Sequence, residues 1–160
     1  MRADFQVLVI PFVIGQNEKL EVAVFKRNDG EYWQFIAGGG ENDETLLEAA
    51  QREAYEEAGI AARDSKYFKL DTMAMIPKIY FHDHKNKIGL YVIPEYCFGV
   101  LIENKALLSS GEHPEYSWVS YEKAMNCLRY DSNKTALWEL KERIRNGDIA
   151  VHQTRNTINH

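Results

Sequence analysis

Residues 38–60 read GGGENDETLLEAAQREAYEEAGI, and the interpretation of the remaining chain starts from this stretch. Glu56 and Glu57 follow Glu53 at the spacing of one helical turn. An α-helix places Glu56 about 60° to one side of Glu53 and Glu57 about 40° to the other. Like charges at these spacings destabilise a helix by roughly a few tenths of a kcal/mol per pair, so we expect a compensating cation. Mg²⁺ suits such oxygen ligands and needs only one or two carboxylates together with water and substrate phosphates.

The residues around these glutamates argue against the alternative, a solvated acidic helix face. Gly38 is followed by five residues, Glu44, seven further residues and the run REAYEEAGI at residues 52–60. This spacing resembles the Nudix box, GX5EX7REUXEEXGU with U aliphatic, and every fixed position is filled. Ala54 is small where a larger aliphatic side chain is common. Such a match would arise by chance about once in 10⁸ starting positions, so the resemblance is specific over residues 38–60.

The same stretch has the local signals of a loop followed by a helix. Thr45 and Glu48 form a capping-box pattern at the expected start of the helix. Gly59 suits the left-handed position that ends a helix. The three glycines at residues 38–40 predict a tight loop and a close approach of the backbone to a ligand. An apolar stripe beside the acidic face is expected to pack on a sheet, and it consists of Leu47, Ala50, Ala54 and Ala58.

Length and composition predict one domain over residues 1–160. The chain of 160 residues is 45% hydrophobic and 12% aromatic, which is ordinary for a globular protein with a real core. The net charge of −5 argues against a nucleic-acid-binding surface, which is normally basic. A local acidic cluster can still bind a polyphosphate, because a bound metal ion inverts the local charge.

The sequence also predicts the compartment. Cys97 and Cys127 lack metal-ligand spacing and are expected to be buried thiols in a reducing environment. The start of the chain shows no signal peptide, and no apolar run reaches the roughly 18 residues of a membrane span. We therefore expect a cytoplasmic protein without a membrane partner. The oligomeric state stays open, a homodimer included.

The remaining chain predicts an α+β fold. Hydrophobic patterning and turn signals indicate strands at residues 5–14, 20–27, 32–36, 67–75, 91–102 and 116–119, and helices at 121–128 and 134–145. The first two strands are expected to form a hairpin. Ser120 is the expected N-cap of the first of these helices, and the apolar positions of the second are Leu137, Trp138, Leu140 and Ile144. The Nudix resemblance implies an α/β/α sandwich with a mixed sheet between helices and the loop–helix motif at the active site.

The resemblance implies hydrolysis of a nucleoside diphosphate linked to another group, with water attacking phosphorus. Mg²⁺ or Mn²⁺ and the positioning of the reactants would supply most of the acceleration. The implied metal ligands are the carboxylates of Glu53, Glu56 and Glu57 and the carbonyl of Ala37. The spacing does not show which glutamate is the base. Arg52 is expected to hold a neighbouring glutamate, and Glu44 to pair within the motif or support the metals from behind.

A downstream segment, EHPEYSW at residues 112–118, looks like the E-H-x-x-Y-x-W segment of several Nudix subfamilies. Glu112 is therefore a candidate metal ligand or base, with Glu115 second. The alternative is two loop acids flanking the strand that buries Trp118. Lys26 and Arg27 end a strand close to the box, where they either meet substrate phosphates or are solvated.

The run HDH at residues 82–84 can suggest a metal site, but no further ligand pattern supports one. We expect an exposed loop at residues 78–90, bordering the pocket.

The substrate is predicted from weaker signals. Trp33 and Gln34 before the box, the E-H segment and DSNK at residues 131–134 together look like the dihydroneopterin triphosphate and dATP pyrophosphohydrolase branch. That likeness implies a nucleoside or pterin triphosphate cut to a monophosphate and pyrophosphate. Gly38 and Gly39 would approach the phosphates, Trp33 would stack on the ring, and Asn133 would hydrogen-bond to it. Alternatively, Trp33 is core and residues 132–133 cap the helix that starts at Lys134.

Two rival functions remain. A dinucleoside polyphosphate hydrolase of the diadenosine tetraphosphate type also carries an E-H segment. A non-catalytic Nudix module that binds a nucleotide is the second, although such modules are expected to have eroded boxes and this box retains every acid.

Overall fold

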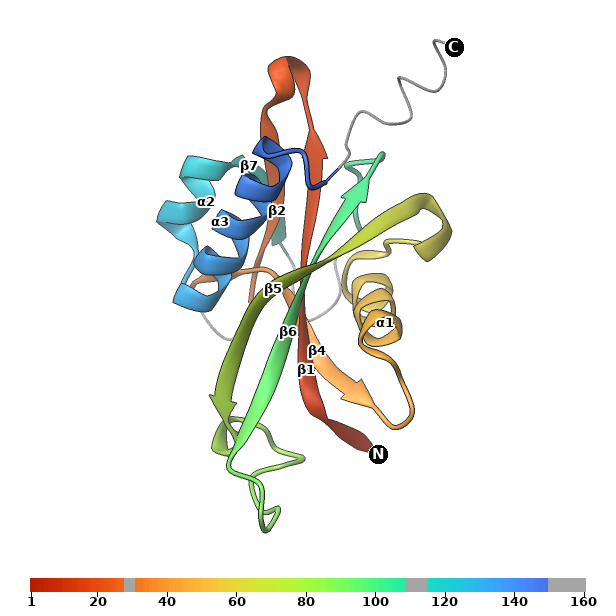
Figure 1. Cartoon of the computed structure of the whole chain (residues 1–160), viewed down its shortest axis with the longest axis vertical. Coiled ribbons are helices and arrows are strands. Elements are labelled where there is room, and N and C mark those ends of the chain that lie inside the picture. The colour runs from red at the N-terminus through yellow and green to blue at the C-terminus, as the bar shows by residue number, and fades with distance from the viewer. Residues whose placement is uncertain (28–30, 109–114, 150–160) are drawn as a thin grey trace.

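The computed structural model describes residues 1–27, 31–108 and 115–149 of the chain. Within these residues, one mixed sheet separates a single helix from a pair of helices (Figure 1). The strands are β1 Arg2–Ile14, β2 Leu20–Lys26, β3 Trp33–Gln34, β4 Ile36–Glu41, β5 Ser65–Pro77, β6 Val92–Ile102 and β7 Glu115–Ser120. The helices are α1 Leu46–Ala58, α2 Tyr121–Cys127 and α3 Asp131–Arg145, with short 3-10 turns at Gln16–Glu18, Ala62–Asp64 and Lys78–Tyr80. This is the predicted α/β/α sandwich of the α+β class.

Strand β1 is the centre of the sheet. The sheet order is β3-β2-β1-β6-β5, and β4 and β7 pair in addition with β1 and β2. β1 pairs antiparallel with β2, which confirms the predicted hairpin, and parallel with β6. Residues 7–12 of β1 are buried on both faces of the sheet, as expected for a continuous apolar run that carries helices on both sides.

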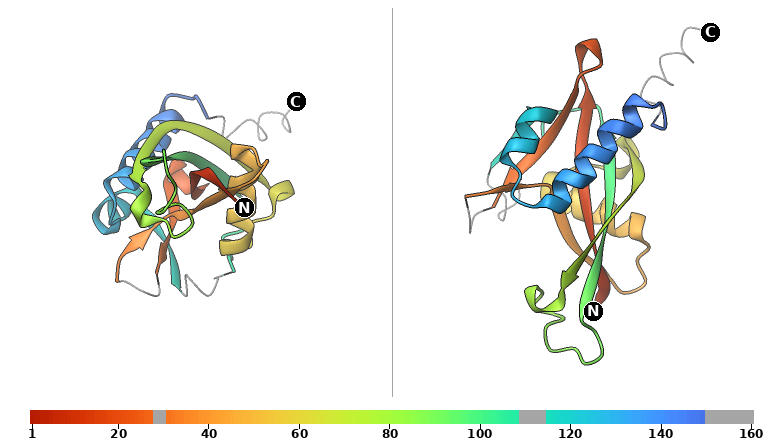
Figure 2. Two further views of the ribbon diagram at one scale, coloured as in Figure 1. Left: turned by 90° about the horizontal axis from the view of Figure 1, so that it is seen from below. Right: turned by 60° about the vertical axis from the view of Figure 1, so that its left-hand side comes forward.

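Alternate residues of β1 belong to two separate cores. Val7 and Val9 pack with the buried alanines of α1, whereas Leu8, Ile10 and Phe12 pack with α2 and α3. This alternation follows from the two-residue period of a strand. α3 runs obliquely in front of the sheet in the right-hand view of Figure 2, and its N-terminal end lies toward α2.

Two helix starts test the capping predictions. The Ser120 hydroxyl accepts a hydrogen bond from the Lys123 amide, so Ser120 caps α2 as predicted. α3 begins at Asp131 rather than Lys134, and its N-cap is Tyr130. Residues 132–133 are therefore not the cap; they lie inside the first turn, where the backbone is already helical. Trp138 is 54% exposed and is not one of the core positions of α3.

The helix within the box has the predicted ends and, apart from one residue, the predicted apolar stripe. Thr45 and Glu48 form the reciprocal capping box, and Gly59 ends the helix with φ +70°. Leu47, assigned above to the apolar stripe, is 43% exposed, and Ala49 takes its place beside Ala50, Ala54 and Ala58. Ala50, Ala54 and Ala58 are buried as predicted, and Leu47 was wrong because the buried face of α1 extends toward Glu53 and Glu57.

The glycines before the helix do not form the predicted tight loop. All three belong to strand β4, and the turn follows at residues 42–43, where Asp43 has φ 68°. A β-carbon on Gly38 would lie 2.1 Å from the Glu53 carboxyl carbon, and one on Gly40 would lie 2.1 Å from the Phe5 ring. Their small size is needed to admit neighbouring side chains, and strand geometry does not require glycine.

The segment 78–91 folds back onto the start of β1. His84, expected in an exposed loop, is only 2% exposed, and its Nε2 lies 3.0 Å from the Ala3 carbonyl and 3.3 Å from Asp4 Oδ1. Arg2, at the start of β1, forms an ion pair with Asp83 of this segment at 3.3 Å. The burial comes from contacts distant in sequence, which local patterning does not reveal.

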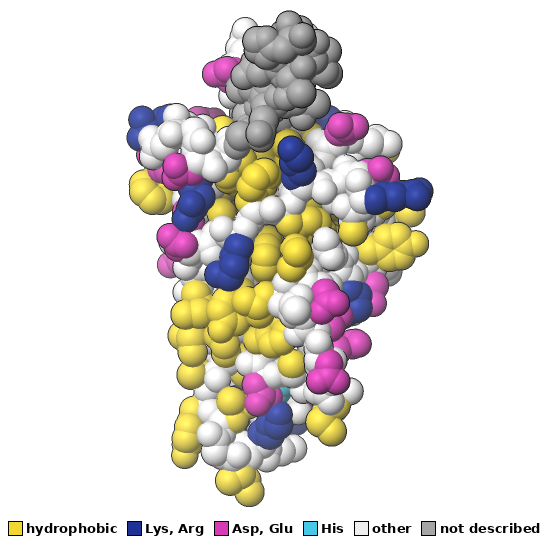
Figure 3. Space-filling view, turned by 45° about the vertical axis from the view of Figure 1, so that its right-hand side comes forward, with side chains coloured by type: hydrophobic (Ala, Val, Ile, Leu, Met, Phe, Trp, Pro, Cys, Tyr) yellow, Lys and Arg dark blue, Asp and Glu magenta, His cyan; other side chains and the backbone are white. Residues whose placement is uncertain are grey.

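A band of apolar side chains is exposed on the face shown in Figure 3. The exposed large apolar residues of β5, β6 and the segment between them are Met73, Met75, Ile79, Tyr80, Ile88, Tyr91 and Val92. Cys97 is buried as predicted, Cys127 is partly buried, and both thiols are free. In the described part of the chain, no helix combines the length and the apolar character that a membrane crossing needs.

Candidate active site

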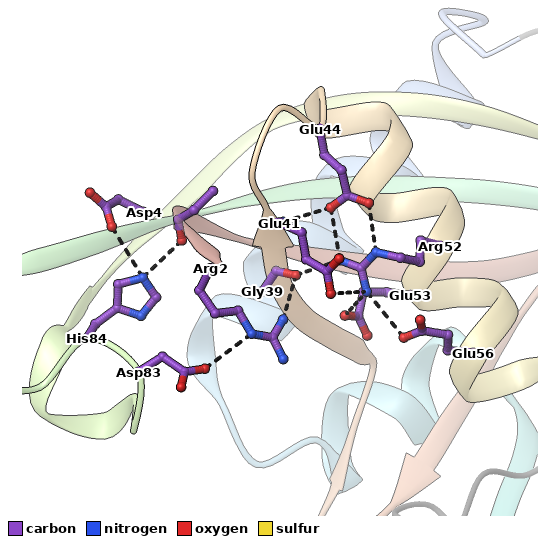
Figure 4. Close-up of polar contacts among 11 residues, drawn as sticks. Arg2, Asp4, Gly39, Glu41, Glu44, Arg52, Glu53, Glu56, Asp83 and His84 are labelled. Atoms are coloured by element: carbon purple, nitrogen blue, oxygen red, sulfur yellow. Dashed lines mark hydrogen bonds and ion pairs between the residues drawn. The ribbon is translucent and has the colours of Figure 1, made fainter.

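Arg52 lies at the centre of the polar cluster at the box (Figure 4). Its Nε lies 2.7 Å from Glu44 Oε2, and its Nη2 donates to the Gly39 carbonyl at 2.8 Å. Its Nη1 lies 2.9 Å from Glu53 Oε1 and 3.2 Å from Glu56 Oε2. The fork geometry of the guanidinium permits this multiple engagement. The predicted contact between Arg52 and neighbouring glutamates is thus present, and Arg52 ties α1 to β4.

Glu44 holds the turn between β4 and α1. Its Oε1 accepts from the Glu41 amide at 2.8 Å and from Arg52 Nη2 at 3.0 Å. The hydrogen bond from Arg52 is the main reason that the pKa of Glu44 is lowered, against a smaller opposing effect of burial. The same contact raises the pKa of Arg52. Glu44 therefore pairs within the motif, one of the two roles expected for it.

Glu53 is the most enclosed acid of the site. It is 6% exposed and lies against Gly38, which has room for the carboxyl only because it lacks a side chain. Burial raises the pKa of Glu53 to about 7, and the negative charge of Glu57 adds to this, while the hydrogen bond from Arg52 opposes it. Mutual repulsion between buried carboxylates is the condition that a divalent cation relieves.

The other two box glutamates have different surroundings. Glu57 is 7% exposed, whereas the Glu56 side chain is 55% exposed and pairs with Arg52. Among the described residues, no three His, Cys, Asp or Glu side chains are already grouped as a metal site. The donor set nevertheless fits a hard cation. Glu53 and Glu57 are carboxylates close enough for the charge of one to act on the other, and Glu56 lies one helical turn from Glu53. Mg²⁺ would need only these oxygens together with water and phosphate oxygens to complete an octahedron.

The backbone candidate Ala37 lies in β4, directly before Gly38, and pairs with Leu8 of β1. Because β4 pairs only with β1 in the described residues, its other edge has no strand beside it. α1 packs against β4, so this edge and the box helix are neighbours. The structure therefore brings together Gly38, Arg52 and Glu53, with Ala37 next to Gly38 in the same strand, and a metal-binding role for these residues stays a prediction.

The predicted substrate contacts lie farther out. Lys26 ends β2 opposite Trp33, and Arg27 follows it. Trp33 is partly buried against the α2–α3 core, and its carbonyl accepts from the Arg129 amide at 3.1 Å. Asn133 is 3% exposed, and its Oδ1 accepts from the Phe35 amide at 3.0 Å. That hydrogen bond anchors α3 to the chain before β4, which favours a supporting role for Asn133.

The downstream acids are only partly described. Glu112 lies outside the described residues, and Glu115 is the exposed first residue of β7, paired with Lys26 of β2. Trp118 of β7 donates its indole N–H to the Lys105 carbonyl at 2.8 Å.

Two polar residues of the sheet, Arg2 and Glu95, were not predicted from the sequence as site residues. Arg2 donates to the Gly39 carbonyl at 3.0 Å, the same oxygen that Arg52 holds. Glu95 is 6% exposed, and burial raises its pKa to about 7. A usable signal existed for Glu95, because it is the one charged residue in the apolar run YVIPEYCFGVLI. No local signal existed for Arg2, since its partner is distant in the chain.

Comparison with known families agrees with this geometry. The family model described as the NUDIX domain matches residues 6–140, which include the whole box and most of the sheet. The chain belongs to the Nudix family and is a hydrolase acting on pyrophosphate bonds.

Three similar proteins illustrate the match. A crystal structure of a protein assigned to the NUDIX hydrolases, from Listeria monocytogenes, has 45% identity and a TM-score of 0.82, and the match covers 91% of this chain and 97% of that one. The dihydroneopterin triphosphate diphosphatase of Escherichia coli K12 is 25% identical over 133 residues, 82% of this chain and 89% of that protein. An Ap4A hydrolase of C. elegans shares the fold, with 15% identity, a TM-score of 0.65 and coverage of 88% and 98%.

Proposed function

We propose that this protein is a Mg²⁺- or Mn²⁺-dependent pyrophosphohydrolase that cuts a nucleoside or pterin triphosphate to a monophosphate and pyrophosphate. The single observation that carries the proposal is the contact of the buried Glu53 carboxyl with Gly38, beside Glu57 and the Arg52 fork. The likeness to the diphosphatase of E. coli supports the choice of a triphosphate.

The residues of the chain divide the work. Glu53, Glu56 and Glu57, with the Ala37 carbonyl, would hold the metal, and Glu112 is a further candidate ligand or base. A bound divalent ion supplies charge neutralisation on the phosphates and lowers the pKa of a bound water. Arg52 positions Glu53 and Glu56 by holding both from the same guanidinium. The edge of β4 that pairs with no described strand would give the phosphates access to the backbone of Gly38 and Gly39.

The residues that would contact the substrate outside the box are proposed from their places in the fold. Lys26 and Arg27 supply positive charge where β2 ends. Trp33 offers a partly buried aromatic side chain beside Leu128, where α2 ends. Asn133 would act mainly by fixing Phe35 and the chain that leads into β4.

The test is a product analysis. The purified chain is incubated with Mg²⁺ and, separately, dATP, dGTP, dihydroneopterin triphosphate and diadenosine tetraphosphate. Release of pyrophosphate with the matching monophosphate from a triphosphate is expected. Cleavage of diadenosine tetraphosphate alone would replace the proposal by the rival hydrolase, and absence of cleavage would refute it. Glu57→Gln should lower kcat by about 10³-fold or more, because one metal-binding carboxylate is lost. Glu122→Gln on the exposed face of α2 is the control.

A further inference from the structure

Glu95 is a buried acid without a side-chain partner among the described residues. It is 6% exposed and lies in the first half of β6, two residues before Cys97 of the α2–α3 core. No hydrogen bond or ion pair joins its carboxylate to any residue that the structure describes. An unpaired carboxylate in such surroundings destabilises a fold. Stability therefore gives no reason for an acid at this position.

The carboxylate of Glu95 is nevertheless within reach of a ligand. Among the described side chains, the polar atoms that are sealed from solvent and lack a hydrogen bond belong to Glu57, Tyr67 and His84. The Glu95 oxygens are not in this group. α3 covers the strand farther along, because a β-carbon on Gly99 would lie 2.9 Å from Leu140. In the right-hand view of Figure 2, the start of β6 extends beyond the helix. The Glu95 oxygens are therefore not completely sealed from solvent, although the residue is only 6% exposed.

Gln6 lies directly beside Glu95 on the same face. The two residues are in register across the parallel β1–β6 pair. Leu8 and Ile10 alternate with the α1-facing residues of β1, so Gln6 points toward the α2–α3 side as they do. The Gln6 amide also makes no hydrogen bond with a described residue. An amide and a carboxylate therefore lie side by side, and neither has a hydrogen-bond partner in the described part of the chain.

This pair is connected to the phosphate end of the site. Gln6 pairs in register with Gly39 of β4, and the Gln6 amide nitrogen would lie 3.3 Å from a β-carbon on Gly39. Gly39, Gln6 and Glu95 therefore form a line across three neighbouring strands. Strands are about 4.8 Å apart, so Glu95 is roughly 10 Å from Gly39. The Gly39 carbonyl accepts from Arg52, which holds Glu53.

We propose that Glu95, together with Gln6, recognises the ring of the substrate by an edge carrying two adjacent N–H donors and a carbonyl. This 2-amino-oxo edge is common to guanine and pterin. A carboxylate only accepts hydrogen bonds, so its two oxygens match the ring N–H and the exocyclic amine, and the Gln6 amide donates to the carbonyl. Adenine offers one donor beside one acceptor and matches an ionised carboxylate poorly. The inference rests on the proposed function, whose ring-binding end it specifies.

The burial of Glu95 agrees with this assignment. A carboxylate held away from bulk water forms stronger hydrogen bonds to a ligand than an exposed one. A site built to pair with N–H groups discriminates strongly against rings that lack them, because its own buried groups are then left unpaired. Gln34, also buried, is not part of the pair, since it lies in β3 beside Phe25.

The experiment compares wild type with Glu95→Gln, using dGTP and dATP with Mg²⁺. Glutamine keeps the shape and replaces one acceptor by a donor. For dGTP, kcat/KM should fall roughly 10- to 100-fold, mainly through a higher KM. For dATP it should stay within about threefold, because the new donor–acceptor pair suits adenine. Glu122→Gln is the matched control, and a melting curve checks that Glu95→Gln folds.

Two outcomes would overturn the inference. One is an equal loss for both nucleotides, which would indicate a structural role; the other is no change for either. If wild type hydrolyses no triphosphate, the proposed function fails, and binding of GMP and AMP by calorimetry then tests Glu95 separately. Tighter binding of GMP by wild type, weakened in Glu95→Gln, would support the assignment without any turnover. Equal GMP binding by both proteins would refute it.

Discussion

The Glu53 carboxyl fills the space that a side chain on Gly38 would need. A β-carbon on Gly38 would lie 2.1 Å from the Glu53 carboxyl carbon and 2.3 Å from its Oε2. The glycine of the box is thus required by the acid of the box, across the contact between β4 and α1. The contact between β4 and α1 therefore gives a structural reason for the fixed spacing of Gly38 and Glu53 in the motif.

Gly38→Ala should therefore displace Glu53 from its position. We expect kcat to fall by about 10²-fold or more, since a shift of about 1 Å in a reacting group can have that effect. Steady-state kinetics with Mg²⁺ measure it. Gly15→Ala is the control, because a β-carbon there would meet only ordinary contacts, the nearest at 3.7 Å. Wild-type kcat in Gly38→Ala would show that Glu53 needs no fixed place.

Arg52→Lys tests whether the fork matters more than the charge. Lysine keeps the positive charge but cannot hold Glu44, Glu53 and the Gly39 carbonyl at once. We expect a lower Tm and a kcat reduced roughly 10- to 100-fold. Arg145→Lys at the exposed end of α3, where the arginine pairs with Glu142, should change neither. Equal Tm and kcat in Arg52→Lys and wild type would contradict this role.

Divalent ions should stabilise the folded protein if the box glutamates bind them. A ligand at about 100 times its Kd adds about 2.7 kcal/mol to the free energy of unfolding, so Tm should rise with Mg²⁺ or Mn²⁺ and return after chelation. Glu53→Gln and Glu57→Gln should each remove most of this rise. A rise of equal size in these variants would place the binding of the ion elsewhere.

Glu95→Gln should change the pH dependence of stability. The pKa of Glu95 is raised by burial to about 7 in the folded state from a usual value of 4.5. Because the folded state binds the Glu95 proton more tightly than the unfolded state does, the raised pKa contributes stability that is fully present below pH 4.5. This contribution is lost as the pH rises through 7. Glu95→Gln should therefore gain stability over wild type across this window, by up to about 3 kcal/mol. Parallel stability curves from denaturant unfolding would contradict this.

Glu139→Ala should destabilise the junction of α3 with β5. The Glu139 carboxylate accepts from the amides of Asp71 and Thr72 at 2.6 and 2.8 Å, where the β5–β6 register shifts. Removing it leaves both amides without this acceptor, so the free energy of unfolding should fall by about 2–3 kcal/mol. Glu142→Ala, whose carboxylate pairs only with Arg145 among the described contacts, is the control and should leave the Tm nearly unchanged. A Tm unchanged in Glu139→Ala would show that water replaces the carboxylate.

Much of this fold could be predicted because its signals are local. The capping box of Thr45 and Glu48, the C-terminal Gly59 and the N-cap Ser120 each depend on residues within one helical turn. The start of α3 was misplaced because Asn133 resembles a cap, whereas its side chain bonds to the distant Phe35. Local rules cannot distinguish these two uses of the same amide.

The sequence by itself determined the family, the box helix and the acids on it, because a fixed spacing on a regular helix sets which side chains share a face. Tertiary structure alone decided which of these acids are enclosed, why Gly38 must lack a side chain, and that His84 is buried. It also placed Gly39, Gln6 and Glu95 in one line across three strands. The physical reason is that burial and register arise from pairing between distant segments, which no local pattern of the chain encodes.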